Sequence, residues 1–327
     1  MLHYISYILY FVAFVAIYQA VQWIVRKPRI SGLTSKYVLI TGCDHGFGNM
    51  LTKRLDKAGV NVFATCLTGK GSKVLDEETS TRVKTLIMDV TKTESIRKAF
   101  QTVKDLLPQG TGLWGLVNNA GISGLSCPYE WLQKEDFQHV LDINILGMID
   151  VTNIFLPLIK QSKGRVVNIA SVLGRIASPG GCYSISKFAV EAYSDGLRAM
   201  LRPFGIRVQI IEPGFFETNI LNEASLFRGL DEKWNALPTD IKQEYGPEYL
   251  SEWKTFLIDG SRRFMSPRTD RVINALEHAL TSWWPRTRYV VGPDAFFFLI
   301  PLSFMPAAVT DLLGGRLGKF PIPAACK

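Results

Sequence analysis

Tyr183 and Lys187 are the residues whose types and spacing point most directly to chemistry. They are four positions apart, and residues i and i+4 of a helix lie on one face about one turn apart. Ser171 precedes them, directly after an apolar stretch, residues 165–170, that has the composition of a buried strand. A phenol, an ammonium and a hydroxyl that converge on one point suit the removal of a proton from an alcohol.

The three residue types predict how that proton is taken. A tyrosine with a reference pKa of about 10 is a poor base at neutral pH. A lysine ammonium roughly 5 Å away, at an effective dielectric of about 20, favours the phenolate by about 3 kcal/mol, or about two pKa units. We therefore expect Lys187 to lower the pKa of Tyr183, and Ser171 to hold the substrate oxygen as it becomes a carbonyl. The Tyr-x-x-x-Lys pair alone occurs on many helix surfaces, so other motifs must support this hypothesis.

A glycine-rich turn near the start of the chain predicts a dinucleotide site. Residues 37–41 form a short apolar run, the sequence Gly-Cys-Asp-His-Gly-Phe-Gly follows at 42–48, and residues 49–58 have a helical pattern. Glycines let the backbone approach a pyrophosphate, and the helix N-terminus offers free N–H groups to it. The spacing Gly-x-x-x-Gly-x-Gly differs from the common Gly-x-Gly-x-x-Gly. The expected contacts come from Thr41, Gly42, Asp44, His45, Gly46, Phe47 and Gly48.

Strand and helix patterns alternate over the rest of residues 37–292, which we expect to form one domain. This alternation is typical of an α/β protein with a Rossmann-type, doubly wound parallel sheet. The expected strands after the first are 61–66, 83–88, 113–117, 165–170, 207–212 and 288–291. The expected helices include 93–107, 134–160, one that begins at Tyr183, and 269–281.

Polar residues and turns at the ends of these strands are further candidates for cofactor contacts. Asp89 could accept a hydrogen bond from an adenine amino group, and Thr218 could bond a nicotinamide amide. Asn118, with Ala120 and Gly121 behind it, could hold a ribose or instead stiffen the sheet edge. Cys66, Pro213 and Gly214 complete the expected cofactor-binding set.

Asn144 lies in an apolar part of the helix expected over 134–160. A buried asparagine must find hydrogen-bond partners. It is either a core amide that bends the helix, or a residue that positions a water and links Lys187 to solvent.

Composition excludes several classes of function. The 327 residues are 47% hydrophobic and carry a formal net charge of +8, but the basic residues form no long run, so we do not expect nucleic-acid binding. The surplus charge suits a membrane surface and a phosphate-bearing cofactor. The five cysteines and four histidines lack metal-ligand spacing, so we expect reduced thiols and no metal.

The two ends of the chain predict membrane contact. Residues 1–25 contain no Lys, Arg, Asp or Glu and are long enough to span a bilayer, with a basic linker at 26–36. A cleavable signal would need a charged n-region, and a buried helix would not be apolar all round, so we expect an uncleaved anchor with the domain on the cytosolic side. Residues 219–264 are expected to form a lid over the substrate. Residues 293–327 are apolar and interrupted by prolines, and they either lie on the membrane or belong to the core.

Taken together, these motifs resemble the short-chain dehydrogenase/reductase family over about residues 36–292. Thr41-Gly-x-x-x-Gly-x-Gly, Asn-Asn-Ala-Gly at 118–121, Asn144, Ser171, Tyr183-x-x-x-Lys187 and Pro213-Gly214 occur in the family's order. More specific sequence motifs, such as Leu-Trp-Gly-Leu-Val-Asn-Asn at 113–119, resemble one branch of the family: the microsomal retinol dehydrogenases and their 3α/17β-hydroxysteroid dehydrogenase relatives.

The resemblance implies a membrane-bound enzyme of the endoplasmic reticulum that oxidises a lipophilic alcohol with NAD. Tyr183 would be the general base, with Lys187, Ser171 and Asn144 in support, and Ser171 and Tyr183 would bind the substrate. Retinoid and steroid substrates stay equally open. The helix that bears Tyr183 and the helix over 134–160 make dimer contacts in the family, so a homodimer is an expectation.

One departure leaves NADP open as the less favoured cofactor. Many NAD-preferring members carry an acidic residue at the end of the second strand, whereas residues 65–68 here are Thr-Cys-Leu-Thr. His45 stands where NADP-preferring relatives often have a base.

Two rival hypotheses remain. A lipid-binding or membrane scaffold protein that lost its chemistry would have no need of the full Asn-Ser-Tyr-Lys set. Another Rossmann enzyme, such as a methyltransferase, would not need the Tyr-x-x-x-Lys helix.

Overall fold

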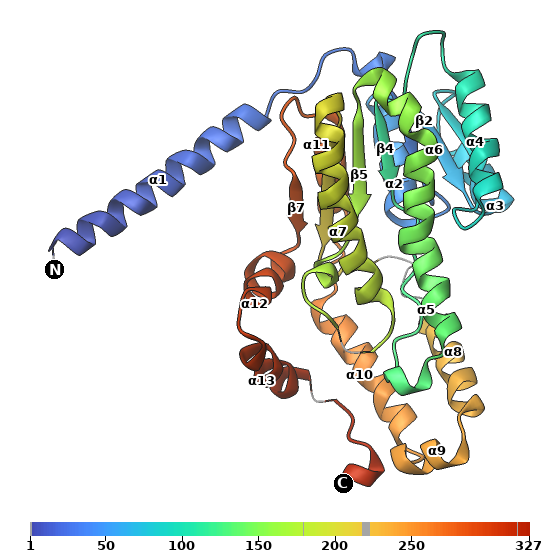
Figure 1. Ribbon diagram of the computed structural model, residues 1–327, viewed down its shortest axis with the longest axis vertical. Coiled ribbons are helices and arrows are strands. Elements are labelled where there is room, and N and C mark those ends of the chain that lie inside the picture. Colours follow the sequence, from blue (N-terminus) through green and yellow to red (C-terminus); the bar gives the residue numbers. More distant parts are fainter. Residues whose placement is uncertain (1, 179, 218–222, 319) are drawn as a thin grey trace.

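A seven-stranded parallel sheet forms the centre of the protein (Figure 1). The computed structural model describes residues 2–178, 180–217, 223–318 and 320–327. The strand order is β3-β2-β1-β4-β5-β6-β7, which confirms the doubly wound α/β fold and places the reversal of strand order between β1 and β4. The strands are β1 Tyr37–Ile40, β2 Asn61–Cys66, β3 Val83–Ile87, β4 Gly115–Asn118, β5 Arg165–Ile169, β6 Arg207–Pro213 and β7 Arg288–Val291.

Helices cover both faces of the sheet, which is why its central strands are almost continuously apolar. One buried cluster joins β1 and β2 to α2 and α11, and a second joins the opposite face to α4 and α6. The helices of the two layers are α2 Gly46–Lys57, α3 Gly69–Glu77, α4 Thr93–Leu106, α5 Lys134–Leu141, α6 Gly147–Ser162, α7 Tyr183–Leu201 and α11 Asp270–Thr281.

Most boundaries lie close to the predicted ones, with two differences. The strand expected from residue 113 begins at Gly115, because Leu113 N donates to Leu158 O at the end of α6. Helix α3 lies between two of the expected strands, where the alternation predicts a helix but two glycines weaken the pattern that would give its bounds; Thr68 caps it by accepting a hydrogen bond from Gly71 N.

The helix expected over 134–160 contains a wider π turn, Asp142–Leu146, between α5 and α6. Among the helices whose side chains are all described, which leaves out part of residues 2–12, the combined helix Lys134–Ser162 is the one long and apolar enough to cross a membrane. Half of its apolar window is buried inside the domain, as in the core helix of a globular protein.

Three helices, α8 Glu223–Ala236, α9 Thr239–Tyr245 and α10 Tyr249–Phe264, occupy most of the expected lid. They enclose an aromatic cluster centred on Trp131, with the Trp131 and Trp234 ring centroids 5.1 Å apart. The C-terminal tail joins this cluster, because the rings of Phe320 and Phe256 lie 4.9 Å apart.

Helix α1, Leu2–Arg26, projects from the body of the protein (Figure 1). Its described large side chains are mostly exposed; Phe11 and Phe14, for example, are each 68% exposed. The helix end is docked on the domain, where Ser282 Oγ donates to Arg26 O at 2.9 Å.

The C-terminal segment also exposes apolar side chains. It contains a π turn, Ala295–Leu299, then α12 Ile300–Ser303 and α13 Ala307–Gly318. Phe297 and Phe304 are 76% and 73% exposed, so these side chains do not belong to an ordinary core. Membrane contact by either end stays a prediction.

Phe155→Ala should strongly destabilise the domain, because Phe155 is fully buried between α6 and α4 and its ring packs edge-on against Phe100. We expect a loss of about 3–5 kcal/mol. Thermal unfolding of the solubilised chain should show a midpoint lower by more than about 6 °C. Phe297→Ala, at an exposed position, is the matched control; equal midpoints for both variants would contradict this account of the core.

Candidate active site

The structure brings Ser171, Tyr183 and Lys187 together at the carboxyl ends of β5 and β6. Lys187 is almost fully buried on α7, and its Nζ donates to Ile169 O, the last residue of β5, at 2.9 Å. The same Nζ lies 5.5 Å from the centroid of the Tyr183 ring, one helical turn away. Ser171 Oγ donates to Pro213 O at 3.4 Å and accepts from Leu173 N at 3.1 Å, and its hydroxyl lies near enough to Tyr183 to affect the pKa of the phenol.

Asn144 lies beside this group, at the centre of the π turn. Its Oδ1 accepts from Ile122 N at 2.8 Å, and its Nδ2 donates to Ile122 O and to Ser186 Oγ, each at 2.9 Å. A Cβ on Gly121 would lie 3.2 Å from Asn144 Oδ1 and 3.7 Å from Lys187 Nζ. The side chain of Asn144 therefore joins the helix to α7 and to the chain after β4, within reach of Lys187. A π turn at such a position is a common feature of functional sites.

Burial sets the electrostatics of the site. It raises the pKa of Tyr183 to about 12, against the opposing effect of the nearby Ser171 hydroxyl. It lowers the pKa of Lys187 to about 8, against the charge of Glu191. In the ligand-free protein the pKa of Tyr183 is therefore raised and not lowered as expected, because burial disfavours the charged phenolate.

The glycine-rich turn is tightly packed on one side and open on the other. Gly42 has a φ of +69°, and a Cβ on Gly48 would lie 2.5 Å from Asn119 Nδ2 and 2.7 Å from Gly42 O. At Gly46, where α2 begins, a Cβ would meet nothing within 4 Å. The backbone is thus exposed where a helix N-terminus presents its N–H groups to an anion. This shape fits the pyrophosphate of a dinucleotide.

Thr41 and Asn119 fix this turn to the end of β4. Thr41 Oγ1 accepts from the backbone N–H groups of Asn119 and Ala120, each at 2.9 Å. Asn119 Nδ2 donates to Thr41 O at 2.7 Å and to Gly42 O at 2.9 Å. Asn119 was not among the predicted site residues; its position as the second residue of the Asn-Asn pair was the available signal.

The side chain of Asn118 points into the core. Its Nδ2 donates to Thr152 Oγ1 at 2.9 Å and to Asn168 Oδ1 at 2.8 Å. Of the two expected roles, these contacts favour stiffening of the sheet edge over contact with a ribose.

Asp44 reaches from the glycine-rich turn to the residues after β2. Its carboxylate accepts from Leu67 N at 2.8 Å, from Thr68 N at 3.0 Å and from Thr68 Oγ1 at 2.6 Å. Partial burial opposes ionisation, but these hydrogen bonds hold the pKa of Asp44 below its usual range. Cys66 is buried beneath, and burial together with the charges of Asp44 and Asp76 raises its pKa to about 12. The ionised carboxylate of Asp44 therefore lies at the end of β2, where the sequence has Cys66 and no acidic residue of its own.

The other predicted cofactor residues lie around the same edge of the sheet. His45 is exposed at the start of α2, and the ring of Phe47 packs edge-on against Phe216. Asp89 accepts from Thr91 N and Thr91 Oγ1 at the end of β3. Pro213 O accepts from Ser171 Oγ at 3.4 Å, and Gly214 N donates to Val291 O. Thr218 lies outside the described residues.

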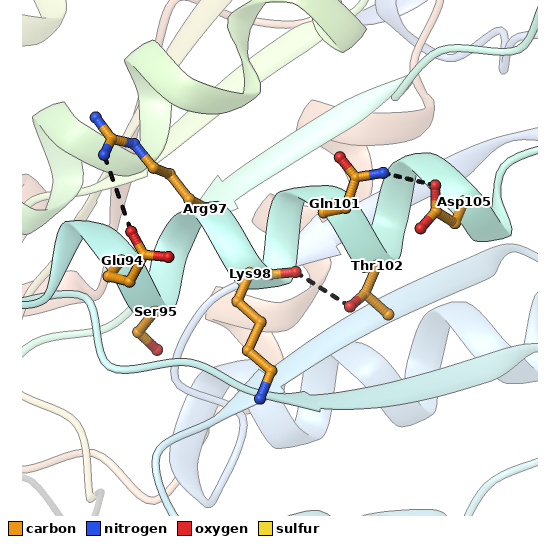
Figure 2. Close-up of a pocket in the computed structure, with 7 residues that line it drawn as sticks. All are labelled: Glu94, Ser95, Arg97, Lys98, Gln101, Thr102 and Asp105. Atoms are coloured by element: carbon orange, nitrogen blue, oxygen red, sulfur yellow. Dashed lines mark hydrogen bonds and ion pairs between the residues drawn. The ribbon is translucent and has the colours of Figure 1, made fainter.

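A hollow of about 620 Å³ lies elsewhere, on the outer face of α4 (Figure 2). Its seven lining residues all belong to this helix, and two of them, Gln101 and Asp105, hydrogen-bond to each other at 2.7 Å. It contains none of the predicted site residues. Over the described part of the chain, no cluster of three or more His, Cys, Asp or Glu side chains could hold a metal ion.

Comparison with known proteins agrees with this geometry. The short chain dehydrogenase family profile matches residues 36–228. The chain belongs to the short-chain dehydrogenase family. As a member it is an oxidoreductase, and the family uses a nicotinamide cofactor.

Relatives and a solved structure cover most of the chain. It is 46% identical to retinol dehydrogenase 16 of Rattus norvegicus over 305 residues, which are 93% of this chain and 96% of that protein. It is 44% identical to 17-beta-hydroxysteroid dehydrogenase type 6 of Homo sapiens over 316 residues, or 97% and 98% of the two chains. A short-chain dehydrogenase from Streptomyces avermitilis aligns with a TM-score of 0.68 at 25% identity, covering 89% of this chain and all of that one.

Alcohol oxidation should be strongly pH-dependent if Tyr183 has to be ionised. With the pKa of Tyr183 above the working range, the phenolate fraction, and with it kcat/KM, should rise about tenfold per pH unit. The rise should level off near pH 8, where Lys187 begins to lose its proton. Initial rates between pH 6 and pH 9 test this. A rate that is flat from pH 6 upward would show that bound nicotinamide lowers the pKa of Tyr183 far below its ligand-free value.

Proposed function

We propose that this short-chain dehydrogenase oxidises a lipophilic alcohol, a retinoid or a hydroxysteroid, at a membrane and with NAD. The observation that carries the proposal is the position of the Tyr183 ring, whose centroid lies 5.5 Å from the buried ammonium of Lys187, with the Ser171 hydroxyl near the same phenol. The names of the two relatives supply the substrate class, because a retinol dehydrogenase and a hydroxysteroid dehydrogenase both cover more than nine tenths of the chain.

Each residue of the site has a separate role in the transfer of one proton. Tyr183 Oη takes the proton of the substrate hydroxyl, and Ser171 Oγ holds the same oxygen as the carbonyl forms. Lys187, fixed by Ile169 O, stabilises the phenolate by its charge. Asn144 keeps the π turn and α7 in register around Lys187 and supports a relay of the proton towards solvent. When bound, the nicotinamide supplies the acceptor for the hydride from the carbinol carbon.

Asp44 supports NAD over NADP. Its carboxylate is held at the end of β2, where short-chain dehydrogenases bind the ribose 2′-oxygen, and its low pKa keeps it charged at neutral pH. A carboxylate there accepts a hydrogen bond from a 2′-hydroxyl and repels a 2′-phosphate. Asp44 can thus take the place of the acidic residue that the sequence lacks at Cys66.

The two ends of the chain support a membrane location. Helix α1 has 25 residues, exposes its described aromatic side chains, ends at Arg26 and is followed by Lys27 and Arg29. We propose that α1 anchors the protein in the endoplasmic reticulum membrane, with the catalytic domain on the cytosolic side and residues 293–327 on the bilayer surface. A homodimer through α6 and α7 fits the exposure of Ile185 and Phe188 on α7.

Tyr183→Phe should abolish oxidation while leaving dinucleotide binding intact, since only the phenol oxygen is lost. Washed membranes that contain either form would be incubated with all-trans-retinol or a 3α-hydroxysteroid, and the products separated by chromatography. We expect product from the parent protein with NAD⁺ and at least about a thousandfold less from the variant. If the parent protein binds dinucleotide but yields no product from either alcohol, a catalytically silent lipid-binding or scaffold role becomes the better hypothesis.

Asp44→Asn should weaken the discrimination against NADP⁺, because it removes the negative charge and keeps the size of the side chain. We expect the ratio of kcat/KM for NAD⁺ to that for NADP⁺ to fall about tenfold, the effect of roughly 1.4 kcal/mol. Asp105→Asn, on the outer face of α4, controls for the change in net charge. A ratio that stays the same in both variants would remove Asp44 from cofactor selection.

A further inference from the structure

A second hollow, of about 250 Å³, opens at the amino ends of β5 and β6, at the opposite end of the sheet from Ser171. Three cationic side chains line it: Lys163, Arg165 and Arg207. Trp114, Trp283 and Ile30 complete most of its wall.

Arg165, the first residue of β5, is unusual because it is 2% exposed and has no acidic partner among the residues that the structure describes. Its Nη1 donates to Ala279 O at 2.6 Å and its Nη2 to Ser282 O at 2.5 Å, while its Nε is buried without a hydrogen-bond partner. The guanidinium also lies 4.8 Å from the centroid of the Trp114 ring. Carbonyl oxygens and a ring face satisfy part of its hydrogen-bonding capacity but do not cancel its charge.

The neighbouring cations add to this charge instead of balancing it. Arg207 is the register partner of Arg165 on β6, and Lys163 lies two residues before Arg165. Over the described residues, none of these three side chains forms an ion pair with a carboxylate. Burial, together with the charge of Arg207, lowers the pKa of Arg165 to about 10, which still leaves it charged at neutral pH. An anion in the hollow would relieve this repulsion.

The hollow lies next to the junction between α1 and the domain. Trp283 N donates to Pro28 O at 2.7 Å and Ile30 N to Thr281 O at 2.8 Å, so the linker after α1 runs along its wall. In Figure 1 this linker passes over the end of the sheet opposite to the helices of the lid. Trp283 and Trp284 are 56% and 48% exposed beside it, and exposed tryptophans are typical of membrane interfaces.

We propose that the pocket formed by Lys163, Arg165 and Arg207 binds the phosphate of an anionic membrane lipid. Guanidinium and ammonium groups suit a phosphate, and a basic pocket beside the end of a membrane helix is where a headgroup can reach. The proposal rests on the proposed insertion of α1 but not on the proposed oxidation.

Lipid retention by a double variant tests this proposal. Lys163→Asn and Arg207→Gln remove the two exposed charges; asparagine tolerates the left-handed backbone of residue 163, whose φ is 47°. The full chain would be reconstituted in phosphatidylcholine nanodiscs with or without phosphatidic acid, and the retained lipid counted by native mass spectrometry. Lys98→Gln with Lys104→Gln, on α4, makes the same change in net charge. We expect the parent and the control to retain phosphatidic acid, and the pocket variant to retain about tenfold less.

Two outcomes would overturn the proposal. Equal retention of phosphatidic acid by the parent and the pocket variant would show that the pocket does not hold the lipid. Binding of inorganic phosphate by the parent in lipid-free detergent, without retention of phosphatidic acid in nanodiscs, would make the ligand a free phosphate. Unchanged dinucleotide binding by the pocket variant shows that it is folded. None of these readouts depends on dehydrogenase activity, so a failure here is distinct from a failure of the proposed reaction.

Discussion

The hydrogen bond from Lys187 Nζ to Ile169 O connects the catalytic helix to the sheet. An ammonium that is almost fully buried is unfavourable by itself, as its lowered pKa of about 8 shows. The ammonium is held by the carbonyl oxygen of Ile169, at the end of a central strand. At this position the sheet ladder no longer provides the carbonyl with a hydrogen-bond donor. The positions of Tyr183, one turn earlier, and of Ser171, two residues beyond Ile169, follow from this contact.

A buried network of charges supports the same region from behind. Glu212 on β6 is fully buried between Arg175 and Arg288, with nitrogen–oxygen distances of 3.0 Å to each. Arg288 also pairs with Glu191, one turn after Lys187 on α7. Burial and the nearby charge of Glu212 raise the pKa of Glu191 to about 7. The network connects β6, β7, α7 and the loop after Ser171, so a change in the position of any of these elements would alter the surroundings of Lys187.

The sequence was sufficient for what depends on local pattern. Apolar runs predicted the strands, since both faces of a parallel sheet are covered, and the motif order predicted which residues meet at its edge. Properties that depend on how the folded chain packs around a residue could not be predicted from the sequence. The pKa of Tyr183 shifts opposite to the expected direction because desolvation depends on packing. The inward direction of Asn118 and the π turn at Asn144 depend on partners such as Thr152 and Ile122, which are distant in the sequence.

The hydrogen bonds at the end of α1 have a mechanical consequence. The carbonyls of Arg26 and Pro28 accept hydrogen bonds from Ser282 and Trp283 of the domain. The connection between α1 and the domain is therefore not a flexible linker. With α1 inserted, the domain could not tumble, and the lid would stay at one height and one tilt above the bilayer. The search for substrate would then be two-dimensional: an alcohol dissolved among the lipids would arrive by lateral diffusion, and its concentration in the membrane, not in water, would set the rate of encounter.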